Sequence, residues 1–338
     1  ERFPPVSEQR QMEAIQTAYS YLNSIGLTTV YDPGGVGINR ESYTRIRTLA
    51  DDGGATLRVF HTLGGGVPST PEEARSVAEE IREARPFQGS EMVDLIAVGE
   101  IYYGPFHWDS LLDPTTPTAE DIEAATNILV AAAEGGWSLQ THASQPETID
   151  LLLDVMMEVN EEFPLRQLCW SVTHADLVGA EQIERMRHLG MNLQLRSISV
   201  LTQPQRYRLL EEIGEAGLHV PPLRLVQNSG IPWGLGTDGT KANQINPFVT
   251  LWWAVTGLAL NGDTVLTETL AREEALIAHT RSNAYLLFQE GNIGAIEPGL
   301  LADMLVLDRD YLTVPEQEIK DILPVATFVG GEIVYGTL

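Results

Sequence analysis

Segments with helical periodicity alternate along this chain with short apolar runs of the kind that form strands. In one segment, Ile149, Leu152, Leu153 and Met156 fall at i, i+3, i+4 and i+7, which places them on a single helix face. Repeated strand-plus-helix units predict a parallel sheet covered by helices. We expect seven strands, at residues 27–31, 56–61, 93–100, 137–142, 168–174, 191–197 and 231–238. Helices are expected at residues 7–25, 40–50, 70–84, 118–134, 179–189 and 203–216.

Seven units are one short of a closed eight-stranded barrel. A barrel without one strand leaves two unpaired inner edges, so either a first strand precedes Glu1 or the architecture differs. The alternative is a doubly wound sheet of seven strands, but no GxGxxG fingerprint with the right spacing follows a strand. We therefore predict an α/β fold, a (β/α)8 TIM-like barrel that lacks its first strand in this chain.

The pattern changes after a helix expected at residues 267–289. Short β-rich runs and turns follow, and Gly330-Gly331 between two of these runs is a hairpin signal. This change predicts two domains, a barrel over residues 1–290 and a small C-terminal β module over residues 291–338.

Charge and composition narrow the classes of partner. The 338 residues include 21 Lys and Arg against 47 Asp and Glu, a formal net charge of −26, which opposes binding to nucleic acid or to anionic membranes. The apolar runs are too short to cross a bilayer. Cys169 is the only cysteine, which excludes an intrachain disulfide and a cysteine-rich zinc cluster. We expect a small-molecule substrate, with homodimer formation left open.

The start of the chain bears on localisation. It begins at Glu1 without a methionine or a signal-like segment, so we expect the natural start to lie upstream. The compartment stays open, with the cytoplasm favoured.

Three residues at strand ends suggest the chemistry. His142, His174 and Asp238 each stand near the C-terminal end of an expected strand. Because the carboxyl ends of parallel strands meet at the mouth of a barrel, two imidazoles and a carboxylate would converge there. Such a group can hold a divalent metal and activate water. Asp238 would serve both as a weak ligand and as the base that takes a proton from that water.

Glu100 ends the strand one upstream of that of His142, after Gly99, which would permit a close backbone approach. A carboxylate here could bridge two metal ions. The other interpretation is a carboxylate that is hydrogen-bonded at the barrel rim.

Other polar residues near strand ends are candidates for substrate binding. Arg196 would orient a carbonyl or carboxylate of the substrate, or would instead neutralise Glu100 or Asp238. His61 ends a strand, His107 follows Glu100 closely, and Lys241 lies in the loop after Asp238.

An imine-forming lyase is a further class that the sequence can test. This chemistry needs a lysine at a strand end. Lys241 and Lys320 are the only lysines of the chain, and neither ends an expected strand. The class is therefore disfavoured.

At these residues the chain resembles the amidohydrolase superfamily, and within it the YtcJ-like amidohydrolase family 3 proteins. The resemblance covers nearly the whole chain and implies a (β/α)8 barrel, a composite β-sandwich made by both chain ends, and metal-assisted hydrolysis of amide or other C–N bonds. The motifs are Gly26-Leu-Thr-Thr-Val-Tyr-Asp32, Thr141-His142-Ala, Thr173-His174-Ala-Asp176, Gly236-Thr-Asp238-Gly, and the tail from Gly294 to Asp308 with Gly330-Gly-Glu-Ile-Val-Tyr335.

The resemblance also implies roles for single residues. His142 and His174 match the metal-binding histidines of the fifth and sixth strands, and Asp238 matches the eighth-strand aspartate. Glu100 falls where many relatives use a carboxylated lysine, so the resemblance leaves one or two metal ions open. The first-strand His-x-His pair of the superfamily has no counterpart here and is expected upstream of Glu1.

Together these observations predict a metal-dependent hydrolase that cleaves an amide, a formamide or another C–N bond with metal-activated water. Zinc is the ion that we expect. The alternative is a catalytically inactive amidohydrolase-like protein that binds a ligand or partner without turnover, because two histidines and two carboxylates without the first-strand pair would hold a metal weakly.

Overall fold

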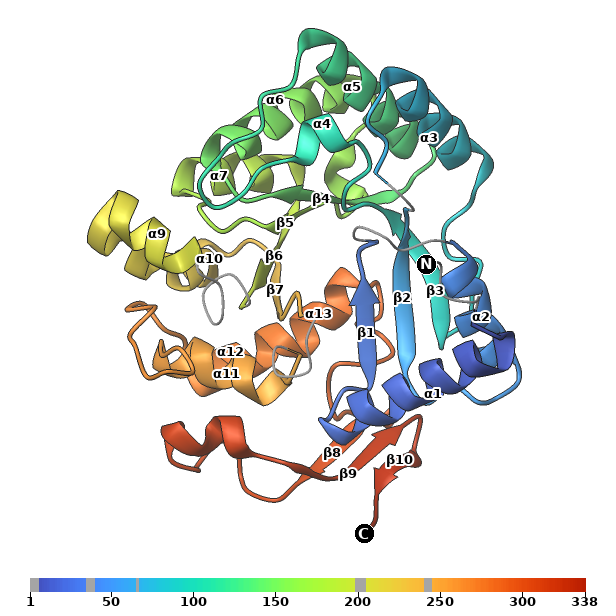
Figure 1. Ribbon diagram of the computed structural model, residues 1–338, viewed down its shortest axis with the longest axis vertical. Helices are drawn as coiled ribbons and strands as arrows, with labels where there is room; N and C mark the ends of the chain where they lie inside the picture. The colour runs from blue at the N-terminus through green and yellow to red at the C-terminus, as the bar shows by residue number, and fades with distance from the viewer. Residues whose placement is uncertain (1–5, 35–39, 65–66, 198–204, 240–244) are drawn as a thin grey trace.

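The computed structural model describes residues 6–34, 40–64, 67–197, 205–239 and 245–338. Its main element is a parallel sheet whose seven strands are hydrogen-bonded in chain order. The strands are β1 (Thr29–Asp32), β2 (Arg58–Leu63), β3 (Val93–Val98), β4 (Ser138–Ala143), β5 (Ser171–His174), β6 (Asn192–Arg196) and β7 (Trp233–Gly236). The sheet curls into a half-barrel (Figure 1), which confirms the predicted barrel-like α/β fold and its seven strands.

Helices connect the strands and cover the outer side of the sheet (Figure 1). They are α1 (Glu8–Ser24), α2 (Arg40–Asp51), α3 (Pro71–Glu83), α4 (Gly104–His107), α5 (Ala119–Glu134), α6 (Pro146–Glu162), α7 (Ala180–Leu189), α9 (Gln205–Ile213), α10 (Leu223–Ser229), α11 (Pro247–Thr256), α12 (Arg272–His279) and α13 (Arg281–Leu286). The single helix predicted at residues 267–289 was wrong. Two helices lie there, because Thr280 leaves the helical region with φ −126° and ψ −85°. Residues 203–204 of the helix predicted at 203–216 lie outside the described residues.

The start of α3 shows how local sequence sets an element boundary. The Thr70 side chain accepts a hydrogen bond from the backbone N–H of Glu73, and the Glu73 carboxylate accepts one from the backbone N–H of Thr70. This capping box satisfies two of the N–H groups that every helix start leaves unpaired. Pro71 follows at the first helical position, where its missing N–H costs nothing.

The two ends of the large sheet, at β1 and β7, are not hydrogen-bonded to each other in the part of the chain that the structure describes. Helix α13 packs against β7, and its Asn283 donates a hydrogen bond of 2.9 Å to the backbone carbonyl of Leu235. Leu287, just after α13, packs with Phe60 of β2 and Ile96 of β3. The segment around α13 therefore links β7 with the other half of the sheet.

A separate antiparallel sheet follows the barrel. Its strands are β8 (Met304–Leu307), β9 (Pro324–Val329) and β10 (Glu332–Gly336), in the order β10-β9-β8. Gly330 and Gly331 form the turn between β9 and β10, as the hairpin signal predicts. Helix α1 packs against β9 and β10, so both ends of the described chain meet here (Figure 1). The domain boundary near residue 290 stays a prediction.

A buried ion pair joins the two sheets. Arg58 of β2 is 1% exposed, and its guanidinium donates to both carboxylate oxygens of Asp303, at 2.7 and 3.0 Å. Asp303 also accepts a hydrogen bond of 2.7 Å from the backbone N–H of Gly330. This contact fixes the tail sheet to the base of the barrel.

We expect Asp303→Asn to lower the free energy of unfolding by about 3–5 kcal/mol, because it leaves the buried Arg58 charge without its partner. Denaturant titration followed by circular dichroism measures the change. The control is Glu134→Gln, which breaks the exposed Arg82–Glu134 pair of 3.4 Å and should cost no more than about 1 kcal/mol. Equal effects of the two variants would show that the buried pair does not anchor the tail sheet.

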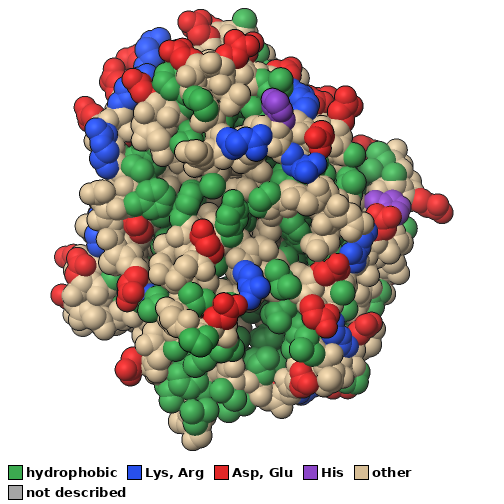
Figure 2. Space-filling model, turned by 180° about the vertical axis from the view of Figure 1, so that it is seen from behind, with side chains coloured by type: hydrophobic (Ala, Val, Ile, Leu, Met, Phe, Trp, Pro, Cys, Tyr) green, Lys and Arg blue, Asp and Glu red, His purple; other side chains and the backbone are tan. Residues whose placement is uncertain are grey.

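Acidic side chains lie over the whole face seen in Figure 2, with basic ones between them, as the net charge predicts. Apolar side chains gather at its lower end, which the tail sheet forms. Exposed apolar residues of this part include Val306, Val325, Ile333 and Tyr335. Among the described residues, no helix has both the length and the apolar character that crossing a bilayer requires.

Candidate metal centre

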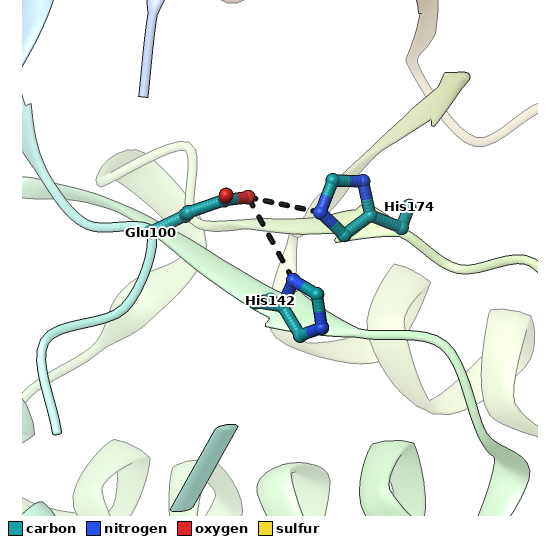
Figure 3. A group of neighbouring side chains, drawn as sticks. All are labelled: Glu100, His142 and His174. Atoms are coloured by element: carbon teal, nitrogen blue, oxygen red, sulfur yellow. Dashed lines mark ion pairs between the residues drawn. The ribbon is translucent and has the colours of Figure 1, made fainter. Parts of the chain in front are cut away.

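Three of the predicted residues meet at the carboxyl edge of the sheet (Figure 3). Glu100 follows β3, His142 lies in β4 and His174 ends β5. Because β3, β4 and β5 are parallel neighbours, their carboxyl ends lie side by side. Gly99 allows the approach of the Glu100 backbone, since a Cβ atom at this position would overlap the carbonyl oxygen of Gln140.

The three side chains point their polar atoms at one another. Glu100 Oε2 lies 3.0 Å from His174 Nε2 and 4.0 Å from His142 Nδ1. The imidazole rings are 4.5 Å apart and nearly perpendicular. One potential ligand atom from each residue lies within 4.8 Å of the other two, a spacing that a single ion can bridge.

Burial makes this arrangement costly without an ion. Glu100 is 8% exposed and His174 is 3% exposed. Glu100 Oε2 and His142 Nδ1 are both buried, and neither has a hydrogen-bond partner in the described part of the chain. Buried polar atoms in native proteins are nearly always satisfied, so these two call for a missing partner. A divalent cation fits, because carboxylate oxygens and imidazole nitrogens are its usual ligands.

Burial and neighbouring charges shift the pKa of all three side chains. Burial lowers the pKa of His174 well below its usual range, and the nearby Arg196 charge adds to this, so the ring is neutral and offers a lone pair. Burial alone would lower the pKa of His142, but Asp109 and Glu100 outweigh it and the pKa is raised. Burial raises the pKa of Glu100. These directions show how strongly the three groups depend on neighbouring charges.

Asp109 contacts His142 from the side away from Glu100, and sequence reasoning missed it. Its Oδ1 lies 2.9 Å from His142 Nε2, and its side chain is fully buried. Its Oδ2 accepts backbone hydrogen bonds from Ser144 at 2.6 Å and Gln145 at 2.9 Å. Asp109 lies in an irregular segment 33 residues before His142, where no periodicity in the sequence predicts a contact.

His107 is fully buried behind β4. Its Nδ1 lies 3.2 Å from the backbone carbonyl of His142, and its ring meets that of Tyr102 edge-on. Burial, helped by the His142 charge, lowers the pKa of His107 to about 3, so this ring is neutral. The structure therefore brings His107 to the backbone of the site, outside the group of three.

Asp238 and Arg196 form a pair beside the group of three. Arg196, at the end of β6, donates from Nη1 to Asp238 Oδ2 at 2.6 Å and from Nη2 to Asp176 Oδ2 at 2.8 Å. Asp238 lies two residues beyond β7, and its charge partly opposes the lowering of the pKa of His174 that burial causes. Of the sequence interpretations of Arg196, neutralisation of Asp238 is the one for which the structure shows a contact.

One predicted substrate residue, His61, is not brought to this group. His61 stacks on Tyr43 of α2 at 3.8 Å and lines a cavity of about 220 Å³. Its neighbour Thr62 instead bonds the backbone of Gly99, so alternation along β2 turns His61 toward the helices. Lys241 lies outside the described residues.

Tyr31 of β1 is a further residue near Glu100 that sequence reasoning missed. Its hydroxyl is buried and has no hydrogen-bond partner among the described residues. Burial raises the pKa of Tyr31 well above its usual range, and the charges of Asp32 and Glu100 add to this. The motif that contains Tyr31 can be recognised in the sequence. The direction in which the Tyr31 side chain points cannot be.

Comparisons with known proteins identify the family and the fold of the chain. A family model described as amidohydrolase family matches residues 1–335. An N-substituted formamide deformylase from Arthrobacter pascens is 25% identical over 62% of this chain and 38% of its own length. An imidazolonepropionase from Pyrobaculum arsenaticum is 24% identical over 89% of this chain and 64% of its own length. The chain thus spans less than two thirds of these relatives.

Solved structures show the same fold. An uncharacterised metal-dependent hydrolase from Pyrococcus horikoshii superposes with a TM-score of 0.68 at 23% identity, over 92% of this chain and 62% of that one. Guanine deaminase from C. acetobutylicum superposes with a TM-score of 0.63 at 15% identity, over 97% of this chain and 76% of that one. The family model covers nearly the whole chain, and the chain belongs to the amidohydrolase family.

Proposed function

We propose that this chain carries the centre of a metal-dependent hydrolase that cleaves an amide, a formamide or a cyclic C–N bond. The observation that supports this most is the buried group of Glu100, His142 and His174, with two polar atoms that lack a partner. Zinc is the ion that we propose, since imidazole and carboxylate ligands suit it. One ion needs only these three residues, and a second would need further ligands.

A divalent ion held by these residues would supply a water that ionises near neutral pH and a Lewis acid for the substrate carbonyl. The residues of the chain do the rest. Glu100, His142 and His174 hold the site together at the sheet edge. Their burial keeps bulk water away from the reacting bond, which strengthens every electrostatic interaction there.

Asp238 is the base in this proposal. It takes a proton from the attacking water and passes it to the leaving nitrogen, which departs as a neutral amine. Arg196 orients the carboxylate through its 2.6 Å contact, and Asp176 holds Arg196 from the other side. With both terminal nitrogens of Arg196 engaged, its role is to position Asp238.

The substrate class rests on the relatives. One is named for an N-substituted formamide and one of the superposed structures for guanine, and both compounds present a carbon bonded to nitrogen. A third relative is named an imidazolonepropionase. We therefore propose a formamide or a cyclic amide as substrate. In this proposal His107 and His61 do not contact the substrate. His107 contacts the backbone of β4, and His61 lies on the outer face of β2.

The test uses the complete gene product. It is incubated with N-benzylformamide and with a cyclic imide, and release of amine or acid is followed by chromatography. We expect turnover that disappears after dialysis against 1,10-phenanthroline and returns with Zn²⁺. Turnover that is unaffected by complete metal removal would refute the proposal. Firm metal binding without turnover of either substrate would favour a protein that binds without catalysis.

A further inference from the structure

Backbone hydrogen bonds fix the position of the Asp109 carboxylate. Its Oδ2 accepts two backbone N–H groups, from Ser144 and Gln145, directly before α6. The N-terminal end of a helix favours negative charge, so this oxygen is fixed as an acceptor. The other oxygen, Oδ1, lies 2.9 Å from His142 Nε2.

This contact decides which nitrogen of His142 carries the proton. Oδ1 and a bare Nε2 would both present lone pairs at 2.9 Å and repel, so Nε2 must hold a hydrogen. In a neutral imidazole the other nitrogen then carries a lone pair. Nδ1 faces Glu100, and Figure 3 shows Nε2 on the far side of the ring. The lone pair therefore points into the group of three.

We propose that Asp109 is a positioning residue that selects the Nε2–H tautomer of His142 and so makes Nδ1 the metal-binding atom. The inference rests on the proposed metal centre. Asp109 touches neither the ion nor the substrate in this proposal. It acts through His142, as carboxylates commonly do behind metal-binding histidines.

The proposal makes Asp109→Asn a harmful change, although it is the closest substitution in shape. The two backbone N–H groups require an acceptor at the Oδ2 position, so the asparagine oxygen must sit there. Its NH₂ group then replaces Oδ1 and donates toward His142 Nε2. This favours the opposite tautomer, with the proton on Nδ1, where it blocks the ion. Asp109→Ala removes the preference without reversing it.

The experiment measures Zn²⁺ affinity by competition with a chromophoric chelator and records Co²⁺ absorption spectra. We expect Asp109→Ala to bind Zn²⁺ about 10–100-fold more weakly than the unchanged protein. Asp109→Asn should bind about tenfold more weakly still, because its amide opposes the required tautomer. Asp113→Asn, an exposed carboxylate of the same segment, is the matched control and should change nothing. If Asp109→Asn bound Zn²⁺ as tightly as Asp109→Ala, or more tightly, the proposal would be overturned.

A second measurement needs no metal and no variant. In the metal-free protein with ¹⁵N-labelled histidine, at a pH high enough for the His142 ring to be neutral, long-range ¹H–¹⁵N correlations distinguish its two tautomers. We expect the Nε2–H form, and the Nδ1–H form would overturn the inference. If the unchanged protein binds neither Zn²⁺ nor Co²⁺, the proposed function fails, while the tautomer still tests the role of Asp109.

Discussion

Replacing Glu100 by glutamine should abolish stable metal binding. The change keeps the shape of the side chain but removes the only carboxylate of the group of three, leaving two imidazoles as ligands. Two neutral ligands in a buried site cannot compensate the charge of a divalent ion, whose desolvation is costly. We expect Zn²⁺ affinity to fall by more than about 100-fold, since loss of a residue that only supports a ligand already costs about 10–100-fold.

Elemental analysis after dialysis, together with chelator competition, measures this loss. Glu161→Gln, an exposed carboxylate on α6, is the control and should leave the metal content unchanged. A thermal unfolding curve shows whether the Glu100 variant folds. It should be about as stable as the metal-free protein, because glutamine keeps the size of the side chain and a polar atom near His174 Nε2, which lies 3.0 Å from Glu100 Oε2. Full metal content in Glu100→Gln would mean that the ion binds elsewhere.

The sequence predicts the convergence of these residues because the rule involved is simple. His142 and His174 end successive apolar runs, and parallel strands bring their carboxyl ends to one edge whatever the loops do. Glu100 follows the same rule. The number and order of the strands bring these three positions to the same edge of the sheet.

The direction of side chains along a strand is harder to predict. On β2, Val59, Phe60 and His61 are all buried, because a parallel strand is covered on both faces. Burial therefore gives no alternating pattern from which to infer which residue faces the barrel interior. His61 ends its predicted strand as His174 does, but β2 continues to Leu63 and His61 stacks on Tyr43 on the helical side. Which face a side chain lies on depends on its odd or even position along the strand, and so on the register with the neighbouring strands.

Contacts made by irregular segments escape sequence reasoning for a different reason. Asp109 reaches His142 across 33 residues, from an irregular segment that follows α4 and precedes α5. Its position depends on hydrogen bonds to Ser144 and Gln145, which exist only once α6 has packed. The pairing of Arg196 with Asp238 was one of several interpretations open in the sequence, since any charge at a neighbouring strand end is within reach.

Replacing Asp238 by asparagine should reduce kcat by about 10²–10⁴-fold, the usual contribution of a general base. The metal content should stay the same, because Asp238 lies outside the group formed by Glu100, His142 and His174. The measurement pairs steady-state kinetics with elemental analysis of the same sample. Asp154→Asn, an exposed carboxylate on α6, is the control and should keep full activity.

Chemical rescue separates proton transfer from a merely structural role. The Asp238 side chain is 40% exposed, so a small carboxylate such as formate can reach the space that Asp238→Ala leaves. If Asp238 moves a proton, added formate restores part of kcat in proportion to its concentration while the metal content stays constant. If Asp238 is instead a ligand, the alanine variant loses metal and activity together, and formate does not restore turnover in the metal-depleted sample. The second result would leave the ion with four protein ligands and the reaction without an identified base.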